Sequence, residues 1–144
     1  MIHGMDTGFL VAVEHTEHAE HAVARQVLAG LRSAGDQFAL VAEFMHVVTD
    51  ARRFARPISM KTANQLMHQW WTAAEVIPIF PDNLAMLQFL AWVRQFSLGR
   101  KRLLDTLLAA TFRHAGIQSV LTTNPADFGV FGVFSCVTPA GAVP

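Results

Sequence analysis

The chain has 144 residues, of which 52% are hydrophobic, and its 11 basic residues balance its 11 acidic residues. This length suits one compact domain, and the high apolar content excludes a disordered chain. The zero net charge argues against a protein that binds nucleic acid through its overall charge. The single cysteine, Cys136, excludes an intrachain disulfide. No stretch reaches the roughly 18 apolar residues of a membrane-spanning helix, and a signal peptide is not evident, so we expect a cytoplasmic protein with no membrane contact.

The first half of the chain predicts strands that alternate with helices. The expected elements are a strand over residues 1–5, a short helix from Phe9, a helix over 17–34, a strand over 38–41 and a helix over 59–74. The run 38–41 is continuously apolar, as in a strand that is buried on both faces, and a helical pattern then continues through Glu43. Ser59 is placed to cap the helix that follows it.

The second half continues this alternation. The expected elements are a strand over residues 76–79, a helix opened by Asp82, a helix over 101–115, a strand over 119–122, a polar loop over 123–128 and a strand over 133–137. Pro78 favours an edge position for its strand, because proline cannot donate to a sheet ladder. The whole pattern predicts an α/β sandwich with a parallel sheet, in which functional sites form at the carboxyl ends of the strands.

Four acidic residues fall where such a site would form. Asp6, Glu43 and Asp127 follow strand ends, and Asp105 lies near the start of a helix. Carboxylates that are brought together repel one another unless they take up a proton or share a cation. Mg²⁺ binds oxygen ligands, keeps several waters and can activate one of them against a phosphodiester. The ordinary alternative stays open: Asp105 also suits the helix dipole, and Asp127 could be a simple loop acid.

Basic residues gather in two short stretches, although the net charge is zero. Eight of the 11 lie in these stretches: Arg52, Arg53, Arg56 and Lys61, then Arg94, Arg100, Lys101 and Arg102. Each stretch is either a solvated helix face or a local surface that attracts phosphate beside an acidic pocket.

Two further patterns offer competing interpretations. The triplet from Asp6 to Gly8 spells the aspartic-protease sequence, but that chemistry needs two such aspartates, and this mostly helical chain carries one. His15, His18 and His21 are spaced three apart, so that they could bind a metal from one helix face. Their acidic neighbours favour a solvated face instead.

Three parts of the chain resemble the PIN-domain family, and within it the bacterial VapC-type toxins. They are residues 6–12 (DTGFLVA), 40–44 (LVAEF), and 102–111 (RLLDTLLAAT) with 120–128 (VLTTNPADF). The resemblance covers nearly the whole chain, and the last pair of segments is its most specific part.

The resemblance implies a single PIN domain over residues 1–144, built as a three-layer sandwich with a five-stranded parallel sheet of order 3-2-1-4-5 between helices. It implies a metal-dependent endoribonuclease that hydrolyses RNA phosphodiesters with a metal-activated water. Mg²⁺ or Mn²⁺ would be held by the catalytic residues Asp6, Glu43, Asp105 and Asp127. It also implies the toxin role in a VapBC-like toxin–antitoxin pair, a small cognate antitoxin as partner, often a homodimer, and an RNA substrate that is commonly transfer RNA.

The chain departs from the family pattern at two positions. Asn124 stands where many members have Asp, which leaves open whether Asn124 or Asp127 fills the fourth ligand position, and Gly8 stands where a small polar residue is common. Thr7, Thr123 and Asn124 are supporting candidates, and Arg100, Lys101 and Arg102 are candidates for contact with the RNA backbone. Asn124 also sustains the main alternative, a PIN-fold interaction protein with weak catalysis. A second alternative is an RNA-processing nuclease that has no antitoxin.

Overall fold

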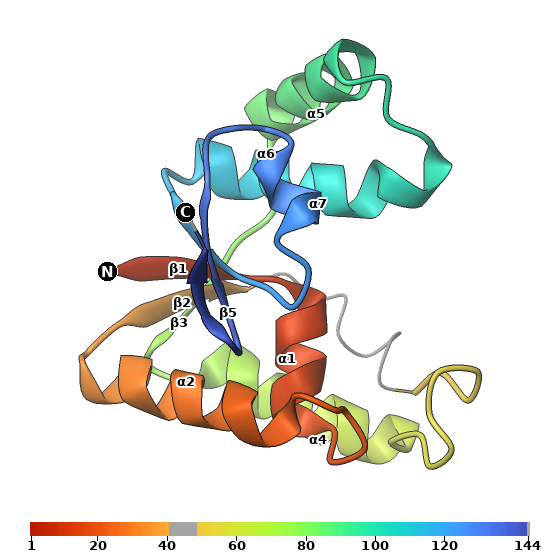
Figure 1. Ribbon diagram of the computed structural model, residues 1–144, viewed down its shortest axis with the longest axis vertical. Coiled ribbons are helices and arrows are strands. Elements are labelled where there is room, and N and C mark those ends of the chain that lie inside the picture. Colours follow the sequence, from red (N-terminus) through yellow and green to blue (C-terminus); the bar gives the residue numbers. More distant parts are fainter. Residues whose placement is uncertain (41–48, 144) are drawn as a thin grey trace.

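Helices cover both faces of a single twisted sheet in the computed structural model, which describes residues 1–40 and 49–143 (Figure 1). In chain order the elements are β1 (Ile2–Met5), α1 (Thr7–Glu14), α2 (His21–Ser33), β2 (Gln37–Leu40), α4 (Met60–Thr72), β3 (Val76–Pro78), α5 (Asn83–Gln95), the 3₁₀ turn η1 (Arg100–Arg102), α6 (Leu103–His114), β4 (Ser119–Leu121), α7 (Ala126–Gly129), β5 (Ser135–Thr138) and β6 (Gly141–Val143). None of the helices in these residues is long and apolar enough to cross a membrane.

The sheet has the order β3-β2-β1-β4-β5-β6. Its first five strands are parallel, which confirms the predicted five-stranded sheet of order 3-2-1-4-5. β6 is an antiparallel addition that pairs with β5 and was not predicted, because three residues after a tight turn are too few to show a period of two. β3 lies at the opposite edge, as Pro78 indicated.

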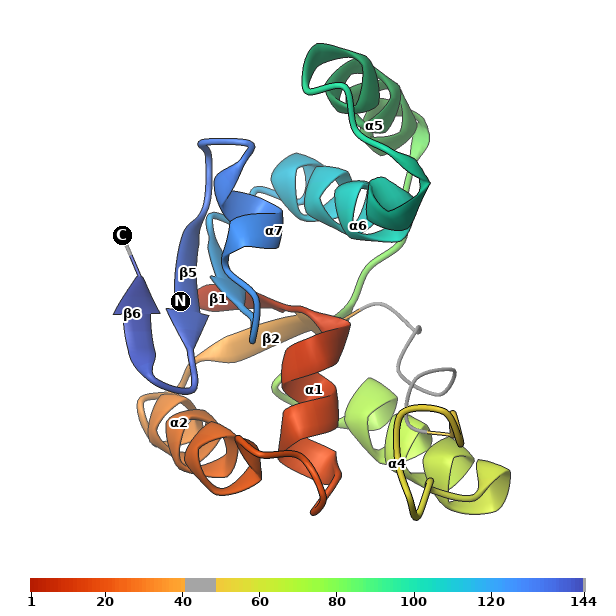
Figure 2. The ribbon, with the colours of Figure 1, turned by 45° about the vertical axis from the view of Figure 1, so that its right-hand side comes forward.

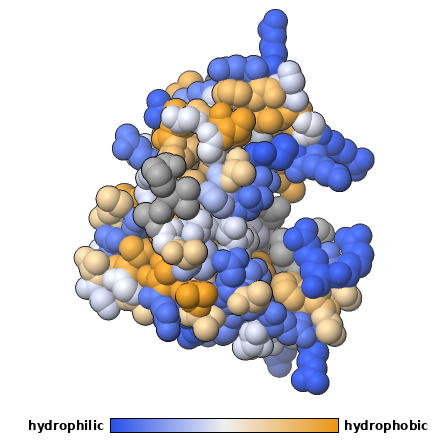
Figure 3. Space-filling view, in the orientation of Figure 1, coloured by the Kyte–Doolittle hydropathy of each residue, from blue (hydrophilic) through white to orange (hydrophobic). Residues whose placement is uncertain are grey.

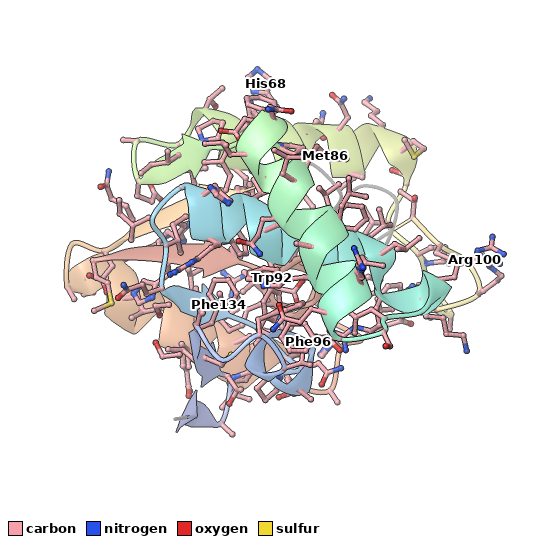
Figure 4. All side chains as sticks on the ribbon, turned by 90° about the horizontal axis from the view of Figure 1, so that it is seen from above. His68, Met86, Trp92, Phe96, Arg100 and Phe134 are labelled. Carbon is pink, nitrogen blue, oxygen red and sulfur yellow. The ribbon has the colours of Figure 1, made fainter. Side chains whose placement is uncertain are left out.

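The two helical layers enclose two separate cores. α1, α2 and α4 lie on one side of the sheet, and α5, α6 and α7 lie on the other (Figures 1 and 2). Successive strand residues point to opposite faces, so that Leu121 belongs to the first core and Val120 to the second. In the second core, Trp92 of α5 stacks on Phe131 and meets Phe134 edge-on, which fixes α5 over this layer (Figure 4).

Close packing against β1 sets the position of α6. A Cβ atom on Gly4 would lie 2.8 Å from the ring of Phe112, so that only glycine lets α6 approach β1 this closely. α6 leads directly into β4 through Gly116, whose φ of 76° suits glycine. The first turn of α6, which carries Asp105, therefore lies at the carboxyl edge of the sheet.

Several predicted boundaries need correction. The second helix begins at His21 instead of residue 17, because the imidazoles of His15 and His18 accept hydrogen bonds from the backbone amides of Glu17 and Glu20 and hold a turn there. The short helix α7 begins inside the expected loop over 123–128 and ends one residue beyond it. The caps are confirmed, since Ser59 accepts from the backbone amide of Thr62, and Asp82 accepts from that of Ala85. The helical pattern through Glu43 lies outside the described residues.

Candidate active site

The predicted site residues meet at the carboxyl ends of β1 and β4. Asp6 follows β1, Thr123 and Asn124 follow β4, Asp105 lies in the first turn of α6, and Asp127 lies in α7. They share one pocket of about 330 Å³, lined by Asp6, Thr7, Gly8, Arg53, Lys101, Leu104, Asp105, Thr123, Asn124 and Asp127. Two of the RNA-backbone candidates, Arg100 and Arg102, are not among these lining residues, and Glu43 lies outside the described residues.

Asp6 is held by the backbone on both sides and directs its carboxylate into the pocket. Its amide donates to the carbonyl of Leu121 at 2.9 Å, and its carbonyl accepts from the amides of Phe9 and Leu10. The hydroxyl of Thr122 donates to Asp6 Oδ2 at 2.9 Å. A hydrogen bond from the backbone of Thr7, the first residue of α1, also lowers the pKa of the Asp6 carboxyl. Asp6 is only 7% exposed, so the carboxylate has little contact with water.

Burial raises the pKa of the Asp6 carboxyl from 3.8 to about 7. The hydrogen bond from Thr122 lowers this pKa, and the negative charges of Asp105 and Asp127 raise it further. Asp6 therefore retains much of its proton at neutral pH when no cation is present. A cation that favours the charged form would displace this proton.

Asp127 is fixed by Arg102 and Asn124. The Nη2 atom of Arg102 donates to the backbone carbonyl of Asp127 at 2.6 Å, and its Nη1 atom lies 3.5 Å from Oδ1 of the carboxylate. The side-chain amide of Asn124 donates to Oδ2 at 3.0 Å. The Nε atom of Arg102 is buried without a hydrogen-bond partner among the described residues. The geometry thus favours a role for Arg102 in positioning Asp127.

Thr122 is the functional residue that the sequence interpretation missed. Its side chain is fully buried, donates to Asp6 and accepts from the amide of Asn124 at 3.0 Å. The strand register is the signal that could have identified Thr122. Met5 pairs with Leu121 at the ends of β1 and β4, so the residues that follow these strands, Asp6 and Thr122, are neighbours.

Gly8 leaves room for the neighbouring Thr123. A Cβ atom on Gly8 would lie 2.8 Å from Oγ1 of Thr123. The Thr123 hydroxyl thus occupies the space that a side chain at position 8 would need. The two departures from the family pattern, at Gly8 and Asn124, therefore lie in the same pocket.

No model of a known protein family matches the chain, and no curated protein matches it. Solved structures do. VapC20 of Mycobacterium tuberculosis, described as a toxin that cleaves the sarcin-ricin loop, superposes with a TM-score of 0.70 at 19% identity, over 92% of this chain and 96% of that one. FitAcB of Neisseria gonorrhoeae gives 0.62 at 18% identity, over 97% and 99% of the two chains. A toxin–antitoxin complex of Klebsiella pneumoniae gives 0.59 at 19% identity, over 95% and 97%.

The chain has the PIN-like α/β fold of VapC toxins. The PIN-like fold excludes the aspartic-protease interpretation of Asp6-Thr7-Gly8, because those enzymes are rich in β structure and this sheet is parallel between helices.

The histidine pattern has a structural explanation within the PIN-like fold. His15 is 3% exposed and stacks on Phe54 with 3.8 Å between ring centroids, so the expected solvated face is wrong for this residue. A ring nitrogen of His21 lies 2.9 Å from the carbonyl of Ala12. These contacts hold α1 to its neighbouring segments, and His15, His18 and His21 do not form a metal-binding group.

The chemistry of the pocket residues fits Mg²⁺ or Mn²⁺. Carboxylate oxygens are the ligands these ions prefer, whereas Zn²⁺ favours His and Cys. Among residues 1–40 and 49–143, no three His, Cys, Asp or Glu side chains are already grouped to hold a metal ion. Carboxylates without a cation repel one another, and the contributions of Asp105 and Asp127 to the raised pKa of Asp6 express that repulsion.

Proposed function

We propose that this protein is a metal-dependent endoribonuclease and the toxin of a toxin–antitoxin pair. One observation carries the proposal: Asp6, Asp105 and Asp127, from three segments far apart in the chain, line one pocket at the carboxyl edge of the sheet. That edge is where α/β folds place their sites. The likeness in fold to VapC20, which is described as a toxin that cleaves the sarcin-ricin loop, supports the same reaction class.

The acidic residues and the side chains that bond to them have defined tasks in this proposal. Asp6, Asp105 and Asp127, with Glu43, would hold Mg²⁺ or Mn²⁺, which supplies a bound water of lowered pKa and polarises the phosphodiester. Thr122 orients Asp6, while Arg102 and Asn124 orient Asp127. The oxygen of a water would form a bond to phosphorus as the bond from phosphorus to the 3′ oxygen breaks. The water gives up a proton, and the departing 3′ oxygen takes up a proton. The products carry a 5′-phosphate and a 3′-hydroxyl.

The proposed partners are an RNA substrate and a small cognate antitoxin. The Klebsiella structure is a toxin–antitoxin complex, and the chain of it that matches shares this fold over 97% of its length. This likeness supports an antitoxin partner here. A homodimer and a transfer RNA substrate remain parts of the proposal that rest on the family resemblance.

Cleavage of cellular RNA tests the proposal. Total RNA is incubated with purified, antitoxin-free protein and Mg²⁺ or Mn²⁺, with EDTA as the metal-free arm. We expect metal-dependent cleavage that Asp6→Asn abolishes, because an amide holds a divalent cation far less well than a carboxylate. Asp82→Asn is the matched control: it makes the same chemical change at a helix cap where Asn serves equally well.

A non-catalytic interaction protein is the second candidate, and the contacts of Asp127 favour it. Both carboxylate oxygens of Asp127 are already engaged, by Arg102 and Asn124. If the folded, antitoxin-free wild type cleaves no RNA with either metal, this candidate replaces the nuclease. If it cleaves RNA but no antitoxin copurifies from its native host, the RNA-processing alternative gains instead.

A further inference from the structure

We propose that Arg53 and Lys101 form a two-sided phosphate clamp across the acidic pocket, and that Leu104 contacts an unpaired nucleotide beside the phosphate that is cut. This inference rests on the proposed function, because it takes the acidic pocket as the place of cleavage. It adds three substrate-binding residues, Arg53, Lys101 and Leu104, to that site.

The two cations reach the pocket from opposite layers of the molecule. Arg53 belongs to the segment just before α4, and Lys101 belongs to η1, just before α6. Figure 1 shows these two segments projecting on the same side of the sheet, one from each helical layer. In the same orientation, Figure 3 shows hydrophilic side chains gathered on both projections with a recess between them. Because Arg53 and Lys101 also line the same pocket, an RNA strand that enters this pocket meets one positive side chain from each layer.

Both side chains are available to a polyanion. The Arg53 side chain is 62% exposed, and its Nε lies 3.6 Å from Asp50 Oδ2, which steadies the side chain without burying it. Lys101 is exposed and forms no ion pair with the residues that the structure describes. Arg102 differs, because its guanidinium is committed to Asp127. Of the run from Arg100 to Arg102, Lys101 is the residue that lines the pocket.

Such a clamp would reduce the electrostatic repulsion between the acidic pocket and the RNA phosphates. The pocket gathers Asp6, Asp105 and Asp127, whose charges repel an approaching phosphate. Cations on either side attract the phosphates that flank the scissile one and lower that barrier. The zero net charge of the chain is compatible with this local arrangement.

Leu104 is an apolar side chain in the lining of the pocket, and a phosphate group would not make a favourable contact with it. It is 62% exposed and lines the pocket beside acidic and basic side chains. A nucleobase or ribose face would cover this side chain. In a duplex the base faces are stacked and out of reach, whereas unpaired nucleotides offer them to protein side chains. The occupant that fits Leu104 is therefore an unpaired nucleotide of the RNA.

The experiment measures RNA binding by fluorescence anisotropy on the full chain in EDTA, so that cleavage plays no part in the readout. Single-stranded RNA is titrated over roughly 50 to 300 mM salt with wild type, Arg53→Gln, Lys101→Gln and the double variant. We expect each single change to reduce the magnitude of the slope of log K against log salt by about 0.7, and the double change by about 1.4. Arg113→Gln, at the other end of α6, is the matched control and should leave the slope unchanged.

Leu104→Ala tests the nucleotide contact separately. We expect about fivefold weaker binding of the single strand at an unchanged salt slope, since the change removes apolar area and no charge. The same strand annealed to its complement should bind more weakly than the free strand and should not respond to Leu104→Ala. Circular dichroism and thermal melting confirm that each variant is folded.

Three outcomes would overturn the proposal: wild type that binds no RNA, a double variant with the wild-type slope, or tighter binding of the duplex. If Leu104→Ala changes the oligomeric state but not RNA affinity, Leu104 belongs to a protein interface and its nucleotide contact is refuted. Failure of the nuclease proposal is a separate result. It appears as absent cleavage with metal, while the salt slopes still report on the clamp.

Discussion

The hydroxyl of Thr122 donates a 2.9 Å hydrogen bond to the carboxylate of Asp6, and both side chains are buried although 116 residues separate them in the chain. The bond exists because β1 and β4 are adjacent and pair Met5 with Leu121. It supports the charged form of a carboxyl group whose environment otherwise favours the neutral form. This relationship makes Thr122 a positioning residue of the site.

Thr122→Val should raise the pKa of Asp6 above its present value of about 7, because the hydrogen bond that lowers it is lost. We expect the pH profile of metal-dependent cleavage to move to higher pH, with a stability loss of about 1 to 2 kcal/mol. Thr111→Val is the control, since it removes a buried hydroxyl that bonds within α6, away from the pocket. A profile that moves equally in both variants would contradict the role of Thr122.

The stability of the metal-free protein should fall as pH rises through the range from 3.8 to about 7. The pKa of Asp6 is higher in the folded state than in the unfolded state. Between these two pKa values the unfolded protein has lost the Asp6 proton while the folded protein still holds it, so the free energy of unfolding decreases as pH rises. A shift of this size corresponds to about 4 kcal/mol. Chemical denaturation in EDTA at several pH values measures it. Asp6→Asn should remove this dependence, and identical curves for the two proteins would refute the raised pKa.

Arg102→Gln should weaken Mn²⁺ binding by about tenfold or more, because loss of a residue that orients a metal ligand typically has this effect. Arg102 contacts both the backbone carbonyl and the carboxylate of Asp127. Isothermal titration calorimetry with Mn²⁺ measures the change. The matched control is Arg100→Gln, which removes the same charge two residues earlier in the chain. The Arg100 side chain is exposed, and Figure 4 shows it at the periphery of the molecule. Equal losses in both variants would mean that net charge, not orientation of Asp127, is responsible.

Asn124→Asp should destabilise the metal-free protein by about 1 kcal/mol, since it replaces the amide that donates to Asp127 with a second carboxylate. Mn²⁺ should offset this loss, because a cation can be shared by the two acids. The measurement is the melting temperature in EDTA and in Mn²⁺. A metal-induced rise no larger than that of wild type would argue that residue 124 does not face the bound ion.

Gly4→Ala should destabilise the fold by about 1 to 3 kcal/mol, because the new methyl group would meet the Phe112 ring at 2.8 Å and push α6 away from β1. Gly30→Ala is the contrasting control. Gly30 lies inside α2 with nothing within 4 Å of the added Cβ, so this change should stabilise the protein by up to about 1 kcal/mol. Urea denaturation measures both. A neutral Gly4→Ala would show that α6 can shift without loss.

The alternation of strands and helices and the helix caps at Ser59 and Asp82 could be predicted from the sequence. These features depend on residues only a few positions apart, so hydrophobic periodicity and side-chain chemistry reveal them directly. Acidic residues directly after strands also follow from local pattern, and the family resemblance supplied the strand order. The shared pocket of Asp6, Asp105 and Asp127 is the spatial consequence of that order.

Only the tertiary structure decided which side chains form hydrogen bonds or ion pairs with those acidic residues. Thr122 instead of Thr123 supports Asp6, and Arg102 is committed to Asp127. Arg53 reaches a pocket whose other lining residues come from positions 6–8 and 101–127. Each contact depends on strand register and on how closely the layers pack, as at Gly4. Register and packing depend on interactions across the whole chain. For that reason the sequence alone determined the kinds of group at the site, and only the folded chain decided which of them touch.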